Sequence, residues 1–216
     1  MANFTDLTNK VNVVLDAIEG HIASKPRLIV AITGAPASGK STLSEELLRR
    51  LKIKKIDAQI VPMDGFHLDN RILDEMNMRP RKGAPETFDA HGFIQLIRTI
   101  REGRPAYYPV FDRPRDIAIA GAGLVSPECQ VIIVEGNYLM FDEDPWRELA
   151  PMWDLTIRWD VPLPELRARL IQRWLSLNHS RTNAVRRAEG NDIPNAERVL
   201  AHALPCDITL PALGAL

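Results

Sequence analysis

Residues 34–41 read Gly-Ala-Pro-Ala-Ser-Gly-Lys-Ser, and one residue separates them from an unbroken apolar run at 28–32. The segment fits the pattern G-x-x-x-x-G-K-[ST] without a mismatch. Glycine lets the backbone turn tightly, so that successive N–H groups can form a nest for phosphate oxygens. The apolar run is typical of a buried parallel strand, and leucines at helical spacing follow the loop. The chain is therefore predicted to be an α/β protein that binds phosphates at a helix N-terminus.

The same loop predicts how a nucleoside triphosphate is held. The backbone amides surround the phosphates, and Lys40 supplies a mobile positive charge for the outer ones. The Ser41 hydroxyl is placed to bind Mg²⁺. We therefore expect ATP and Mg²⁺ as cofactors. The candidate nucleotide-binding residues of this segment are Gly34, Ala35, Pro36, Ala37, Ser38, Gly39, Lys40, Ser41 and Thr42.

Strand and helix patterns alternate along the rest of the chain, which predicts a mainly parallel sheet with helices on both faces. The interpretation is a P-loop NTPase fold with five strands, in a single domain spanning 1–216, with an amphipathic helix at 4–22. Between 64 and 126 the chain is rich in Pro, Gly and Arg and contains one clear helix, so we interpret it as a substrate-binding insertion. The expected strands are 28–33, 58–62, 130–135, 154–159 and 206–210, and the expected helices are 42–51, 93–101, 163–177 and 195–203.

Composition restricts the class of partner. The 216 residues are 45% hydrophobic and 25% charged, with a net charge of −1, which predicts no general attraction to nucleic acid or to an anionic membrane. No apolar run approaches the roughly 20 residues needed to span a bilayer. Cys129 and Cys206 form no metal or redox pattern, and we expect both to be buried thiols in a reducing, cytoplasmic compartment. Isolated tryptophans, such as Trp146 and Trp153, fit either the core or the interface of a homodimer.

Two carboxylates follow predicted strands. Asp64 comes after the second strand and precedes a glycine, so it is a candidate general base for a hydroxyl that attacks phosphorus. Glu135 ends the apolar run Val-Ile-Ile-Val, the Walker B arrangement in which an acid holds Mg²⁺ directly or through water. The alternatives are a turn-forming Asp-Gly pair and a solvated glutamate at a strand end.

An arginine-rich segment follows the fourth strand. Arg169 and Arg173 are four residues apart and so share one helix face. Arginines that close over a γ-phosphate neutralise charge in the transition state and exclude water. We therefore predict a lid at about 169–192, with Arg173 as a catalytic residue; a solvated helix face is the alternative.

Aromatic, acidic and basic residues are mixed at 108–113, as in a pocket for a polar metabolite. His67 has no metal partners at ligand spacing, so no zinc site is predicted. The candidate substrate-binding residues are Asp64, His67, Phe111, Asp112 and Arg113.

Together these segments resemble the phosphoribulokinase/uridine kinase family of P-loop kinases, which includes type I pantothenate kinase. The resemblance extends from residue 28 to about 210. Its most specific parts are the P-loop with Pro36 and Ser38, the Asp-Gly-Phe turn at 64–66, Pro-Glu-Thr-Phe-Asp at 85–89, Pro-Val-Phe-Asp at 109–112 and Glu-Gly at 135–136.

The resemblance implies a five-stranded parallel sheet with the P-loop strand in its centre. It also implies that Asp64 is the catalytic base, that Glu135 belongs to the Mg²⁺ site and that the arginines of the lid contact ATP. Uridine kinases have a tyrosine where Phe111 stands here, so the resemblance leaves the phosphate acceptor open.

The leading hypothesis is an ATP-dependent kinase acting on a hydroxyl of a small metabolite such as a sugar, a nucleoside or a pantothenate-like alcohol. One alternative is a switch that hydrolyses ATP or GTP. A guanine-specifying Asn-Lys-x-Asp should then follow the P-loop, whereas the nearest match, at 9–12, precedes it. Another alternative is a nucleotide-binding regulator without an acceptor.

Overall fold

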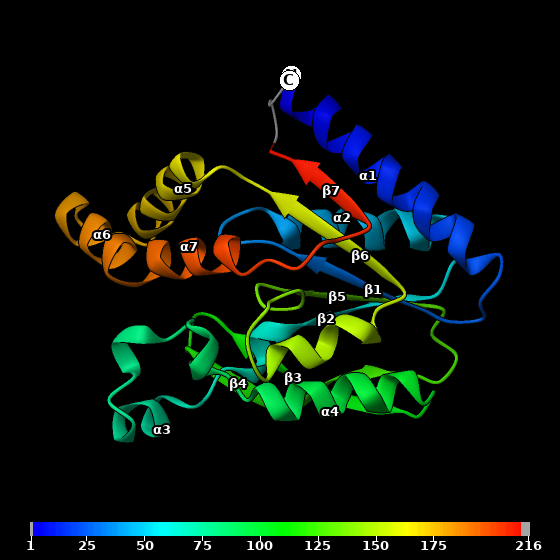
Figure 1. Cartoon of the computed structure of the whole chain (residues 1–216), viewed down its shortest axis with the longest axis horizontal. Helices are drawn as coiled ribbons and strands as arrows, with labels where there is room; N and C mark the ends of the chain where they lie inside the picture. Colours follow the sequence, from blue (N-terminus) through cyan, green and yellow to red (C-terminus); the bar gives the residue numbers. More distant parts are fainter. Residues whose placement is uncertain (1, 213–216) are drawn as a thin grey trace.

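A five-stranded parallel sheet forms the centre of the molecule (Figure 1). The structure is a computed structural model that describes residues 2–212, with side chains from residue 7 onward. The strand order is β2-β5-β1-β6-β7, so the strand before the P-loop is central, as predicted. The last three strands along the chain begin one or two residues later than the sequence predicted. The strands are β1 (Leu28–Thr33), β2 (Ala58–Pro62), β5 (Val131–Gly136), β6 (Leu155–Asp160) and β7 (Ile208–Pro211).

The register of the sheet decides which residues meet at its carboxyl edge. Ile32 of β1 and Pro62 of β2 are both the register partners of Glu135 on β5. Every residue of β1 and β5 is buried, as expected for central strands covered on both faces. The P-loop, the Asp64 turn and Glu135 therefore leave one edge of the sheet side by side.

The predicted helices are present, with ends shifted by a few residues. In α1, Val11, Val14 and Ile18 are fully buried, which confirms the amphipathic pattern within the described side chains; that of Phe4 lies outside them. In α2, the leucines that predicted the helix face the core. The helices are α1 (Ala2–Ile22), α2 (Lys40–Ile53), α4 (Ala90–Arg101), α5 (Leu163–Ser176), α6 (Arg181–Arg187) and α7 (Ile193–Ala201).

The segment at 64–126 holds more structure than the single helix expected. A short helix α3 (Asn70–Glu75) precedes α4, and an antiparallel hairpin of β3 (Ala106–Asp112) and β4 (Ile117–Val125) follows it. No local pattern in the sequence predicted this hairpin. Its first strand contains Pro109, at an irregularity of the pairing, and its second strand is mostly alanine, glycine and isoleucine without polar alternation.

Several smaller expectations are also settled. The Asp89 carboxylate accepts a hydrogen bond from the Gly92 backbone amide and caps α4. Trp146 and Trp153 are core residues. Both thiols are free, and Cys129 is buried, but Cys206 is only partly buried, contrary to the expectation. Among the described residues, no helix has the length and apolar character needed to cross a membrane.

Candidate active site

The P-loop has a partly left-handed backbone, a conformation that favours glycine. Ala37 and Gly39 have φ angles of 63° and 105°, in the left-handed region, immediately before α2 begins at Lys40. At Gly34 a Cβ atom would lie 2.8 Å from both the Ser38 hydroxyl oxygen and the Trp159 carbonyl oxygen. The loop therefore packs closely on β6 and leads directly into a helix N-terminus, where phosphate oxygens are favoured.

A hydroxyl and a carboxylate meet at the start of α2. The Ser41 hydroxyl donates a hydrogen bond to Glu135 Oε2 at 2.9 Å. Burial raises the pKa of Glu135, and the charge of Lys40 opposes this shift. Burial likewise lowers the pKa of Lys40, while Glu135 and Asp64 act to raise it. The Lys40 ammonium and the Glu135 carboxylate thus stabilise each other's charged forms in a site partly shielded from water.

These residues fit a magnesium ion by the chemistry of their donors. Mg²⁺ prefers oxygen ligands and is usually held by one or two carboxylates together with substrate phosphates. Ser41 and Glu135 provide a hydroxyl and a buried carboxylate beside the phosphate loop. Within the described part of the chain, no group of three His, Cys, Asp or Glu residues could hold a metal ion by itself. These donors therefore allow a magnesium site in which the phosphates of the bound nucleotide complete the coordination of the ion.

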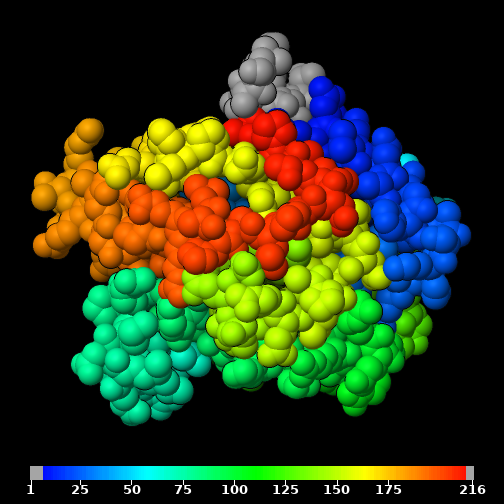
Figure 2. Space-filling model, in the orientation of Figure 1, coloured from blue at the N-terminus to red at the C-terminus, as the bar shows by residue number. Residues whose placement is uncertain are grey.

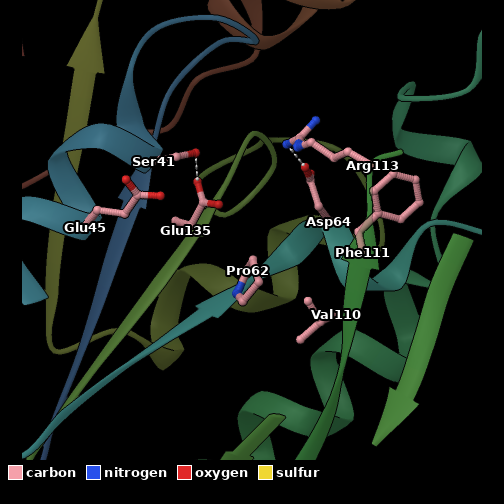
Figure 3. Close-up of a pocket in the computed structure, with 8 residues that line it drawn as sticks. All are labelled: Ser41, Glu45, Pro62, Asp64, Val110, Phe111, Arg113 and Glu135. Atoms are coloured by element: carbon pink, nitrogen blue, oxygen red, sulfur yellow. Dashed lines mark hydrogen bonds and ion pairs between the residues drawn. The ribbon is translucent and has the colours of Figure 1, made fainter. Parts of the chain in front are cut away.

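Asp64 lies on the opposite wall of the same cavity (Figure 3). It belongs to a short 3₁₀ turn, Met63–Phe66, that leaves the end of β2, and its carboxylate forms an ion pair with Arg113 at 2.5 Å. The cavity has a volume of about 170 Å³. It is lined by Ser41, Glu45, Pro62, Asp64, Val110, Phe111, Arg113 and Glu135.

Of the predicted acceptor residues, three line the cavity and two do not. Those that line it are Asp64, Phe111 and Arg113; those that do not are His67 and Asp112. Phe111 lines the cavity and His67 stacks on its ring, with centroids 4.6 Å apart. The His67 Nδ1 atom lies 2.7 Å from the Asp64 carbonyl oxygen, and burial lowers the pKa of the imidazole, which favours its neutral form. Asp112 is not among the lining residues and accepts hydrogen bonds from the Arg115 amide and guanidinium.

The two predicted arginines of the lid have different surroundings. Arg169 donates to the carbonyl oxygens of Ala37 and Ser38, at 3.3 and 2.7 Å, and therefore holds the outer side of the P-loop. Arg173, one turn further along α5, is close enough for its charge to lower the pKa of Lys40. The helices α5, α6 and α7 lie on the side of the sheet toward which the carboxyl ends of the strands point (Figure 1).

The structure adds residues that the sequence analysis did not identify. Glu45 lines the cavity one helical turn after Ser41, an i,i+4 spacing that could have indicated it.

Two contacts between distant segments were also not predicted. The side-chain amide of Asn191, in the π-helical turn at 188–192, donates to the Lys82 carbonyl oxygen at 2.8 Å. Arg198 of α7 forms an ion pair with Glu86. These contacts join the α6–α7 segment, orange in Figure 2, to the segment carrying α3. No local pattern predicts them, because the partners are about 110 residues apart.

The chain is similar to known kinases in sequence and structure. Residues 29–175 match the family described as phosphoribulokinase/uridine kinase. A crystal structure of a "putative fructose transport system kinase" from Silicibacter sp. TM1040 is 50% identical, with a TM-score of 0.86 over 91% of this chain and 98% of that one. The Escherichia coli (strain K12) protein YggC is 37% identical over 82% of this chain and 74% of its own length. The ATP-dependent kinase YFH7 of Lachancea thermotolerans is 31% identical over 69% and 55%.

Proposed function

This chain belongs to the phosphoribulokinase/uridine kinase family of ATP-dependent kinases, and we propose that it transfers the γ-phosphoryl group of ATP to a hydroxyl of a small metabolite. The observation that carries the proposal is the meeting of Asp64 with Ser41 and Glu135 in one cavity beside the phosphate loop. A protein that only hydrolysed or sensed nucleotide would need no separate wall of aromatic and charged residues next to that carboxylate.

Each residue has a defined part in the proposed reaction. The acceptor hydroxyl attacks the γ-phosphorus, its proton passes to the Asp64 carboxylate, and the bond from phosphorus to the ADP oxygen breaks as the new bond forms. The P-loop amides and Lys40 bind the phosphate oxygens. Ser41 and Glu135 would hold Mg²⁺, which when bound neutralises the charge on the β- and γ-phosphates. The pocket around Phe111 and the stacked His67 excludes water from the acceptor.

The arginine-rich segment completes the proposed site. Arg173 is the candidate for neutralising charge on the transferring group, because its charge already reaches Lys40. Arg169 has a supporting part in this proposal, since it holds P-loop carbonyls and pairs with Glu165 on its own helix. We propose that the lid at 169–192 closes over ATP and that the insertion at 64–126 binds the acceptor.

A panel assay tests the proposal directly. Consumption of ATP would be measured with Mg²⁺ and with EDTA, across sugars, nucleosides, pantothenate, hydroxy acids, sugar phosphates and simple alcohols. We expect one class of acceptor to raise ATP consumption far above the rate without acceptor, and EDTA to abolish that consumption. Slow hydrolysis at the same rate with every acceptor, despite ATP binding, would favour a regulator or a switch.

A substitution at Glu135 tests the proposed magnesium site. Glu135→Gln keeps the size of the side chain and its contact with Ser41 but removes the charge. We expect the Mg²⁺ concentration for half-maximal turnover to rise by about 10- to 100-fold, the range seen when groups around a metal are altered. Titration of activity with Mg²⁺ at saturating ATP measures this shift. A half-maximal Mg²⁺ concentration equal to that of the unaltered protein would exclude Glu135 from the site.

A further inference from the structure

One cation of the acceptor wall is paired with the candidate base itself. Arg113 follows directly on β3 and donates from Nη2 to Asp64 Oδ2 (Figure 3). Two other basic side chains of this region have partners away from Asp64. Lys82 is held by Asn70 and Asp116, and Arg115 is held by Asp112. Arg113 is thus hydrogen-bonded to the candidate base itself, whereas Lys82 and Arg115 are bonded to other carboxylates.

This ion pair competes with the proposed part of Asp64 in phosphoryl transfer. The Arg113 guanidinium takes a hydrogen-bonding position on Oδ2, at the wall of the cavity where an acceptor hydroxyl must also approach. A lone pair that accepts from a guanidinium is not free to accept the hydroxyl proton. An acceptor hydroxyl that approaches Asp64 at this position on Oδ2 therefore displaces the Arg113 guanidinium.

The exposure of the two partners shows that this exchange is easy. The Arg113 side chain is 57% exposed, whereas that of Asp64 is 23% exposed. An exposed ion pair contributes little stability, because water screens the charges and two long side chains must be ordered. A second anion near the guanidinium can therefore draw it away, and planar guanidinium groups bind carboxylates and phosphates in a bidentate manner.

An anionic group of the acceptor would have Arg113 as its partner, because Arg113 is the one basic residue among the described residues that line the cavity. Glu45, Asp64 and Glu135 all line the cavity, and bound ATP would add further negative charge. An acceptor that is itself anionic needs a cation at this wall to enter. Arg113 lines the same cavity as Ser41 and Glu135, so a group bound to it would lie close to the reacting atoms.

We propose that Arg113 recognises an oxyanion of the acceptor, a carboxylate or a phosphate, and that this exchange of partner frees Asp64 to take the hydroxyl proton. The inference rests on the proposed kinase function and names its substrate class. In the absence of such an acceptor, Arg113 keeps Asp64 occupied, which suppresses the transfer of the phosphoryl group to water. Arg113 is thus a specificity-determining residue.

The test uses pairs of acceptors that differ in one charge. A hydroxy acid is compared with its amide, and a sugar phosphate with the free sugar, so that the two sources of the oxyanion are distinguished. The variant is Arg113→Met, and the matched control is Arg104→Met, which removes an arginine paired with Glu102 at the protein surface. We expect the unaltered protein and the control to prefer the anionic member of one pair by about 10- to 100-fold in kcat/KM, as for a charge-assisted hydrogen bond. In Arg113→Met the preference should disappear, because kcat/KM should fall for the anionic member of the pair and not to the same extent for the neutral member.

A second measurement needs no acceptor. Without one, Arg113→Met should hydrolyse ATP several-fold faster than the unaltered protein, and the added substitution Asp64→Asn should remove the gain. The inference is overturned if the unaltered protein prefers neutral acceptors, if Arg113→Met slows both members of a pair equally, or if its hydrolysis rate does not rise. Turnover of any acceptor, whatever its charge, supports the kinase function, so the two proposals fail separately.

Discussion

Replacement of Asp64 by Asn is expected to lower the turnover of ATP with its acceptor by about 10²–10⁴-fold, the contribution of a positioned general base. Asparagine has nearly the same shape, so the short turn Met63–Phe66 and the cavity wall should persist. It has no charge, however, and cannot take the proton of the attacking hydroxyl. The affinity for ATP should change little, because the proposed phosphate-binding groups lie on the P-loop and α2.

Turnover and ATP binding have to be measured separately to test this prediction. Steady-state kinetics gives kcat, and titration with a fluorescent ATP analogue gives the dissociation constant. Asp142→Asn is a suitable control, since Asp142 is an exposed carboxylate that also pairs with an arginine, Arg147. A variant Asp64→Asn with the kcat of the unaltered protein would remove Asp64 from the chemistry, and a large loss of ATP affinity would instead assign it to nucleotide binding.

Replacement of Gly65 by Ala is expected to be the most disruptive single-methyl change near the site. An added Cβ would lie 2.0 Å from the Pro109 carbonyl oxygen and 2.6 Å from its carbonyl carbon. Both are backbone atoms of β3, so neither can move without separating the Asp64 turn from the hairpin. Overpacking of this kind costs about 1–3 kcal/mol of stability. Since a shift of about 1 Å at a reactive group can cost about 10²-fold in rate, activity should fall by a similar factor.

The matched control for this change is Gly20→Ala. Gly20 lies in α1, and an added Cβ there has nothing within 4 Å. Because alanine favours a helix over glycine, Gly20→Ala should raise stability by about 0.5–1 kcal/mol. Urea unfolding followed by circular dichroism measures both effects, and kcat/KM follows the activity. Equal stability of Gly65→Ala and the unaltered protein would show that the Asp64 turn and the hairpin are not packed as closely as this contact requires.

The close contact of Gly65 with Pro109 also shows why the hairpin of the insertion could not be predicted from local patterns. The hairpin strand Ile117–Val125 has small apolar residues on both faces, so alternation could not identify it. Its partner strand contains Pro109, and a proline within a segment argues against predicting that segment as a β-strand. The hairpin forms because Gly65 lets the Asp64 turn approach β3 and because the Tyr108 hydroxyl bonds to the Ile60 carbonyl oxygen of β2. Both contacts join residues more than 40 positions apart.

The sequence by itself determined the phosphate loop, the parallel sheet and the carboxylates at the ends of two strands. These features depend on local patterns: glycines that permit tight turns, apolar runs that form buried strands, and polar residues placed directly after them. The central position of β1 was implied by the family resemblance, and the strand order bears it out.

Only the tertiary structure decided which of the candidate residues meet. Ser41 and Glu135 are 94 residues apart and Asp64 and Arg113 are 49 apart, yet sheet register and the hairpin bring each pair into hydrogen-bond contact. It also directed Asp112 toward Arg115 and Arg169 toward the P-loop carbonyls, although their positions in the sequence fit the site equally well. The physical reason is that the direction of a side chain depends on packing between distant elements, which no local pattern encodes.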